Sequence, residues 1–173
     1  MKRNLIWFLI LLFLLEGTMI PWLIPEVWST HVQVAPHFIT VTILYMAIFM
    51  NRYYALVFGL IFGLLQDIIY FGHTVGLQSF SMGLTGYLIG LIFRSAHLSM
   101  FSALSAIFVG IFTYEGIVYA LYRLFRIVEF SFSWALMQIV LPSLVINLLF
   151  ALLIYIPARN YLEGIGNKRQ END

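Results

Sequence analysis

Long apolar stretches separated by short polar segments cover most of the chain. A helix needs about 20 mainly apolar residues to cross the hydrocarbon core of a bilayer. The pattern predicts six such helices, over residues 4–24, 33–50, 53–71, 78–93, 100–122 and 136–156. The expected fold is therefore an all-α polytopic membrane protein, in which residues 1–173 form a single transmembrane domain built as a six-helix bundle.

The second stretch is short for a membrane span. Its unbroken apolar part, residues 38–50, rises only about 20 Å as a helix, whereas the hydrocarbon core is about 30 Å thick. The helix reaches a spanning length if it begins near Gln33, because Pro36 is tolerated in a first turn. Asn51 and Arg52 then make a very tight connection, which predicts an antiparallel hairpin of the second and third spans.

Two further segments lie outside the predicted spans. Arg123, Arg126 and Glu129 are three residues apart with apolar residues between them. On a helix this spacing puts the three charges on one stripe. The pattern predicts an interfacial helix over 123–135 on the outer face of the membrane that the bundle spans. Residues 157–173 are polar and contain glycine, so they are expected to form a frayed cytoplasmic tail.

Composition excludes several classes of protein. Hydrophobic residues make up 62% of the chain and charged residues only 10%, whereas a soluble domain is about 25% charged. Nine basic and eight acidic side chains give a net charge of +1, which leaves no polybasic surface for nucleic acid. The chain has no cysteine, so a thiolate nucleophile and a cysteine metal site are also excluded.

Basic residues predict the orientation, because cytoplasmic loops of membrane proteins are enriched in Lys and Arg. With six spans and a cytoplasmic N-terminus, only Arg123 and Arg126 lie outside. The basic residues on the cytoplasmic side are then Lys2, Arg3, Arg52, Arg94, Arg159, Lys168 and Arg169. A five-span arrangement would leave most of the basic residues outside. The bias therefore favours six spans with both termini in the cytoplasm.

The third span carries the most informative motif, Gly59-xxx-Gly63-xxx-Asp67. Residues four apart share one helix face, and small residues there let another helix approach closely. Helix packing is the favoured interpretation, with partner binding as the other. A similar surface is expected on the fourth span, from Gly83, Gly86 and Gly90. Asp67 costs at least about 2.5–3.5 kcal/mol inside a membrane, so it requires either a structural hydrogen-bonding role or contact with a ligand or partner.

Two other carboxylates, Glu16 and Glu115, also fall in the outer halves of predicted spans. Together with Asp67 they form either one intramembrane polar cluster that opens outward, with Arg123 and Arg126 as compensating charges, or three separate local pairs. The histidines fall in loops or at helix ends, where solvated imidazole is expected; they are His31, His37, His73 and His97. Pro142 is expected to kink the last span, and Asn147 to join helices.

Motifs for catalysis are missing from the sequence. It contains neither the His-Glu-x-x-His zinc pattern nor the Gly-x-Ser-x-Gly nucleophile elbow, and no Gly-x-x-x-x-Gly-Lys phosphate loop. We therefore expect no enzymatic activity, no metal and no cofactor.

The chain resembles the MreD family, the rod shape-determining membrane proteins of bacteria. The resemblance rests on an N-terminal Lys-Arg before a span with Glu16, the Asn51-Arg52 hairpin and the glycine-aspartate helix, and it continues to Gly76, Gly83 and Tyr87. It implies a place in the cell-elongation machinery of the cytoplasmic membrane. The implied partners are MreC, MreB, and the glycosyltransferase and transpeptidase that build the lateral wall. It also implies a bundle similar to the substrate-binding components of energy-coupling-factor transporters.

Two functions remain open at this stage. In the first, the protein is a non-enzymatic scaffold that binds MreC directly and supports lateral peptidoglycan synthesis. In the second, it is a transporter-like component that binds a small molecule or lipid with its outer-half carboxylates.

Overall fold

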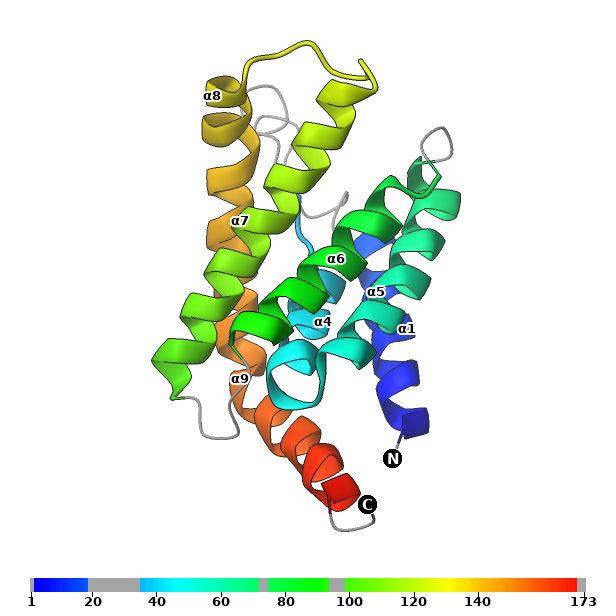
Figure 1. The fold of residues 1–173 in the computed structure, drawn as a ribbon, viewed down its shortest axis with the longest axis vertical. Helices are drawn as coiled ribbons and strands as arrows, with labels where there is room; N and C mark the ends of the chain where they lie inside the picture. Colours follow the sequence, from blue (N-terminus) through cyan, green and yellow to red (C-terminus); the bar gives the residue numbers. More distant parts are fainter. Residues whose placement is uncertain (1, 19–34, 72–74, 94–98, 171–173) are drawn as a thin grey trace.

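The computed structural model describes residues 2–18, 35–71, 75–93 and 99–170 (Figure 1). Within these ranges the chain is helical and contains no strand. The six main helices are α1 (Lys2–Thr18), α4 (Phe38–Phe49), α5 (Arg52–Gln66), α6 (Leu77–Ile92), α7 (Met100–Leu124) and α9 (Leu141–Gln170). The π-helical turn η1 (Asp67–Phe71) extends α5, and the short α8 (Phe132–Ala135) and η2 (Leu136–Val140) lead into α9. The expected all-α six-helix fold is confirmed.

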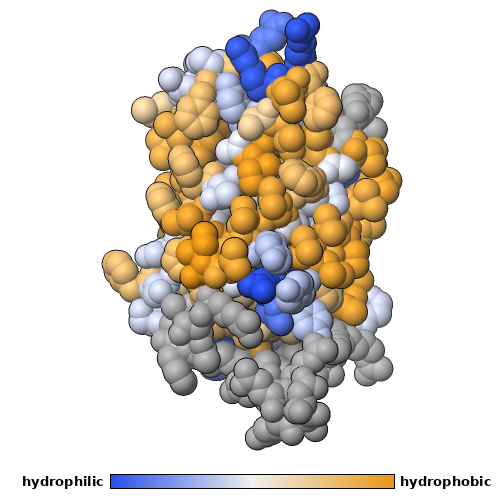
Figure 2. Space-filling model, in the orientation of Figure 1, coloured by the Kyte–Doolittle hydropathy of each residue, from blue (hydrophilic) through white to orange (hydrophobic). Residues whose placement is uncertain are grey.

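The surface of the molecule is that of a membrane protein. Among the described residues, three helical stretches are long and apolar enough to cross a bilayer: Arg52–Tyr70, Met100–Leu124 and Phe132–Leu162. A broad apolar band crosses the face shown in Figure 2, and hydrophilic groups lie above and below it. Large apolar side chains are exposed in this band on several helices, because they face lipid rather than water.

Helix α4 lies at the centre of the bundle. All of its residues from Ile39 to Phe49 are buried, and it contacts α1, α5, α6, α7 and α9. Its 12 residues rise only about 18 Å, less than the thickness of the hydrocarbon core. The expectation that this helix begins near Gln33 is wrong. Helix α4 begins at Phe38, and residues 35–37 before it are not helical.

The connection from α4 to α5 is as tight as expected. Helix α4 ends at Phe49 and α5 begins at Arg52. The side chain of Asn51 caps α5, because its Oδ1 accepts a hydrogen bond from the N–H of Tyr53 at 3.2 Å. This turn lies at the end of the bundle where both chain termini are found (Figure 1).

The interfacial helix expected over 123–135 is not formed. Helix α7 ends at Leu124. After it, Arg126 has a left-handed backbone conformation with φ 56°, and the N–H of Ile127 donates to the carbonyl of Tyr122 at 2.9 Å. This bond pattern terminates a helix. The next helix, α8, begins only at Phe132, so the three charges do not share a helical stripe.

The tail expected after Pro157 is also wrong, because α9 continues through this proline to Gln170. Pro157 has no N–H to donate to the carbonyl four residues earlier, but the helix is held on its far side by Leu162, which is buried in the core. Near Pro142, where a kink is expected, the π-helical η2 precedes the proline and the N–H of Leu141 bonds to the carbonyl of Leu136.

Candidate functional site

The first turn of α4 lies among side chains from other helices. The first N–H groups of any helix lack partners within it, and here Glu16 of α1 supplies one, since its Oε2 accepts from the N–H of Ile39 at 3.1 Å. On the other side, His37 Nε2 lies 3.0 Å from Glu115 Oε1 of α7. Both carboxylates thus lie near the N-terminus of α4, where the helix dipole favours negative charge.

Helix α9 fixes the chain that leads into α4. Asn147 Oδ1 accepts from the N–H of His37 at 2.7 Å, and its Nδ2 donates to the carbonyl of Ala35 at 3.3 Å. Ser143 Oγ accepts from the N–H of Ala35 at 3.0 Å. Because α9 side chains take up these backbone groups, residues 35–37 do not need a helical turn to satisfy them, and α4 starts late.

Asp67 connects the end of α5 to the start of α6. Its Oδ1 accepts from the N–H of Gln78 at 3.1 Å, and its Oδ2 accepts from the N–H groups of Gly76 and Ser79 at 2.9 and 3.0 Å. The residue at the N-cap position, Gly76, has φ +101°, which a side chain would strain. Asp67 therefore caps α6 from a neighbouring helix and is completely buried.

Two glutamines and a tyrosine join these contacts. Gln66 Nε2 donates to Glu16 Oε1 at 2.9 Å, and the hydroxyl of Tyr114 donates to Gln78 Oε1. The ring of Tyr114 also meets that of His37 edge-on, with centroids 4.9 Å apart. We call the whole set the polar ring; its side chains are Glu16, His37, Gln66, Asp67, Gln78, Tyr114 and Glu115. Since its members come from α1, α5, α6 and α7 and surround the start of α4, the polar ring ties the bundle together.

The glycines of α5 face α6 within the same chain. A methyl group on Gly59 would lie 2.8 Å from the Cα of Gly83, and one on Gly63 would lie 2.5 Å from the Cα of Ser79. Ser79 Oγ also donates to the carbonyl of Leu60 at 2.7 Å. Because α6 occupies this face, it is not open to another protein.

The glycines of α6 lie at other close approaches. Gly86 faces Ile43 of α4 and Ala55 of α5, and Gly90 faces the backbone of Arg52. A Cβ at either position would meet these atoms at 2.8 to 3.2 Å. The small residues of this span thus let three helices pack closely.

The three predicted intramembrane carboxylates are linked through intermediate groups rather than directly. Glu16 and Glu115 reach the start of α4 through Ile39 and His37, and Asp67 follows Gln66 in the chain. The outer charges are not part of the polar ring. Arg123 and Arg126 are exposed, and Arg123 Nη1 donates to the carbonyl of Glu129 at 2.6 Å.

Sequence reasoning was wrong about His37 and passed over three other members of the polar ring. The His37 side chain is only 13% exposed and pairs with Glu115, whereas solvated imidazole was expected. His31, His73 and His97 lie outside the described residues. Gln66, Gln78 and Tyr114 were missed, although a glutamine inside an apolar span is itself a signal, because an amide in hydrocarbon requires a partner.

The polar ring is built to hold helices together. Both oxygens of Glu16 and both of Asp67 accept hydrogen bonds from the chain itself. In the described parts of the chain, no three His, Asp or Glu side chains are arranged to hold a metal ion. These contacts satisfy the polar groups that a membrane interior makes costly to leave unpaired.

Helices packed around a short buried helix and joined by intramembrane hydrogen bonds define a polytopic membrane protein whose buried polar groups hold the bundle together. The family model described as rod shape-determining protein MreD matches residues 1–165, and the chain belongs to this family. The rod shape-determining protein MreD of Bacillus subtilis (strain 168) is 26% identical over 166 residues, which cover 95% of this chain and 96% of that protein.

Membership of this family confirms the resemblance read from the sequence and gives the protein a role in cell shape, as part of the rod-shape machinery in the membrane. No solved structure matches the chain. The similarity to substrate-binding components of energy-coupling-factor transporters therefore stays a prediction.

Proposed function

We propose that this protein is a non-enzymatic scaffold of the cell-elongation complex in the bacterial cytoplasmic membrane, with both termini in the cytoplasm. It binds MreC directly, and MreB and the wall glycosyltransferase and transpeptidase belong to the same complex. In this way it supports lateral peptidoglycan synthesis and rod shape.

The use of the intramembrane carboxylates supports this proposal. A transporter-like component that captured a ligand with its outer-half carboxylates would need oxygens free to bind it. Glu16 and Asp67 instead have both oxygens engaged by donors of the chain, and Glu115 pairs with His37. These groups stabilise a fixed arrangement of helices, which is what a scaffold requires.

The glycine faces of α5 and α6 pack within the bundle, so the surface that binds a partner is formed by other residues. Because α6 covers Gly59 and Gly63, a partner helix must lie against outward-facing residues. Strongly exposed apolar side chains are present on α1, α5, α6, α7 and α9. Four of them, each on a different helix, are suitable positions for a probe: Trp7, Ile61, Phe108 and Leu153.

Site-specific photo-crosslinking in growing cells tests the scaffold. A crosslinking amino acid is placed singly at each of these four positions, and adducts with MreC are identified after purification of the full chain. We expect adducts from one or two neighbouring faces and none from the others, and bulky substitutions on the crosslinked face should lower MreC co-purification and widen the cells. Absence of adducts from every face, together with no co-purification of MreC, would contradict direct binding.

A second arm separates the scaffold from the ligand-binding alternative. Asp67→Asn is expressed in place of the natural protein, in cells where the variant reaches the normal level in the membrane. The scaffold predicts that MreC association and rod shape are kept or lost together. Loss of rod shape with full MreC association would instead support a role in binding a ligand.

A further inference from the structure

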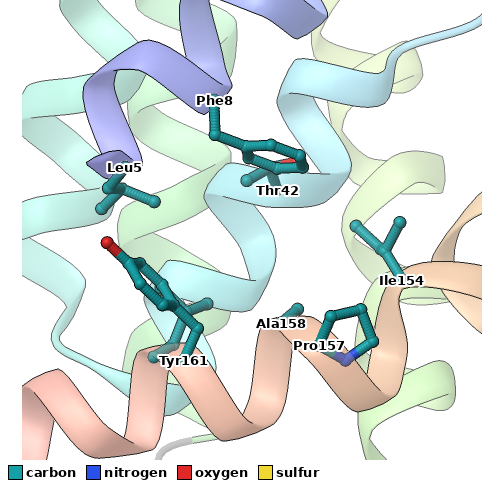
Figure 3. Close-up of a pocket in the computed structure, with 8 residues that line it drawn as sticks. Leu5, Phe8, Thr42, Ile154, Pro157, Ala158 and Tyr161 are labelled. Carbon is teal, nitrogen blue, oxygen red and sulfur yellow. The ribbon is translucent and has the colours of Figure 1, made fainter. Parts of the chain in front are cut away.

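A groove of about 340 Å³ lies between α1, α4 and α9, at the end of the bundle where both termini lie. Figure 3 shows Leu5 and Phe8 of α1, Thr42 of α4, and Ile154, Ala158 and Tyr161 of α9 around it. None of its lining residues belongs to the polar ring, which surrounds the start of α4.

The walls of the groove suit a hydrocarbon. The side chains are apolar apart from two hydroxyls, and that of Thr42 donates to the carbonyl of Phe38 at 3.0 Å. The other belongs to Tyr161, whose oxygen in Figure 3 points from α9 toward Leu5. A polar ligand would therefore find few partners here.

The groove owes its shape to Pro157, which also lines it. A proline inside a helix removes one backbone hydrogen bond and bends the helix. Beyond it α9 turns toward the N-terminal end of α1 (Figure 1), and Leu162 returns to the core with 2% exposure. The bend leaves a wedge between the two helices that the side chains do not fill.

The groove has room for a hydrocarbon chain. Its volume and its apolar walls suit a thin, flexible occupant that lies along the helices.

The sequence next to the groove residues indicates the headgroup. Arg159 directly follows Ala158, and Lys2 and Arg3 come shortly before Leu5 in the sequence. Glu163 is the one acidic residue within three positions of the groove residues. Basic sites between membrane helices attract anionic lipid headgroups.

We infer that the groove binds an acyl chain of an anionic phospholipid, with the lipid phosphate beside Arg159 of α9. This lipid site is independent of MreC binding, so the scaffold and the lipid site can fail separately.

Native mass spectrometry tests the lipid site. The full-length chain is reconstituted in vesicles of phosphatidylglycerol and phosphatidylethanolamine, extracted in mild detergent and weighed with its retained lipid. We expect the natural chain to retain phosphatidylglycerol, and Ala158→Phe, which fills the groove, to lose it. The matched control is Leu153→Phe on the same helix, where the side chain is 77% exposed and retention should be unchanged.

The headgroup is tested by Arg159→Gln. One basic residue near an anionic membrane surface contributes about 1 kcal/mol, so the preference for phosphatidylglycerol over phosphatidylethanolamine should fall about fivefold. An unchanged preference would overturn the assignment of the phosphate to this end of α9.

Two further results bear on the groove itself. Ile154→Phe fills it from another position and should also abolish retention, which covers the case in which Ala158→Phe fails to fold. Equal phosphatidylglycerol retention by the natural chain and a folded groove-filling variant would overturn the inference. The retained lipid would then be ordinary lipid around the protein rather than lipid bound in the groove. Loss of MreC from these variants while their lipid is fully retained would also overturn the inference, because the occupant would then be protein.

Discussion

Asp67 shows how one side chain in a membrane span can be necessary without taking part in chemistry. Its carboxylate accepts three backbone N–H groups at the start of α6. Without it, these donors would be buried and unpaired, which costs more in a membrane protein than at a soluble surface. The sequence singled out Asp67 from its cost in hydrocarbon, but not its partners, because they depend on how the loop after η1 returns the chain.

Replacement of Asp67 by asparagine tests this role. Asparagine has one acceptor oxygen in place of two, so it cannot satisfy all three donors. Since hydrogen bonds to charged groups contribute about 1.5–3 kcal/mol, we expect Asp67→Asn to lower the apparent free energy of unfolding in detergent by about that amount. Glu129→Gln, at an exposed position, is the control, and equal stability of the two variants would contradict the capping role.

His37 marks the limit of local reasoning at the same scale. It follows Pro36 just before a helix, a position typical of a solvated side chain. Its partner Glu115 is 78 residues away in the sequence, so nothing near either residue reveals the pair. The three carboxylates could be recognised one by one, and the two glutamines carried the same kind of signal, but the hydrogen bonds among these groups became visible only when the helices were packed.

At the scale of elements, apolar length predicted which segments are helices but not where each begins and ends. The start of α4 is set by Asn147 and Ser143 on α9, which take up the backbone groups of residues 35–37. The end of α7 is set by the positive φ of Arg126. This backbone conformation is uncommon for residues other than glycine, and the spacing of charges in the sequence does not predict it. Tertiary contacts and local backbone geometry thus override the pattern at these boundaries.

The close contact of α5 with α6 gives the prediction at this scale. In Gly63→Ala the new methyl group would lie 2.5 Å from the Ser79 backbone, so the helices must move apart. Overpacking of this kind costs about 1–3 kcal/mol, measured as the apparent free energy of unfolding in detergent.

A matched control lies on α7. A methyl group on Gly116 would meet no atom within 4 Å, and alanine favours a helix over glycine by about 1 kcal/mol. Gly116→Ala should therefore keep or raise stability. If Gly63→Ala were equally harmless, the glycine face of α5 would not be a tight helix contact.

For the whole molecule, composition and the long apolar stretches were sufficient to predict an all-helical membrane bundle, because a run of about 20 apolar residues crosses a bilayer as a helix. The central position of α4 was not predictable. Its sequence is apolar on all sides apart from Thr40 and Thr42, so it shows no lipid-facing stripe by which a surface helix could be told from a buried one. The five helices around it, rather than its own composition, keep it from lipid.

Orientation in the membrane is the last property of the whole molecule, and the cysteine-free chain allows a direct test. Single cysteines at Glu129 and Asn160, both exposed, lie in the turn after α7 and in α9 beyond Pro157. With both termini in the cytoplasm, a membrane-impermeant maleimide should label Glu129→Cys in intact spheroplasts, and Asn160→Cys only after permeabilisation. The reverse pattern would mean that the basic residues near the termini face outward, against the tendency of Lys and Arg to stay in the cytoplasm. The anionic lipid site would then face the outer leaflet.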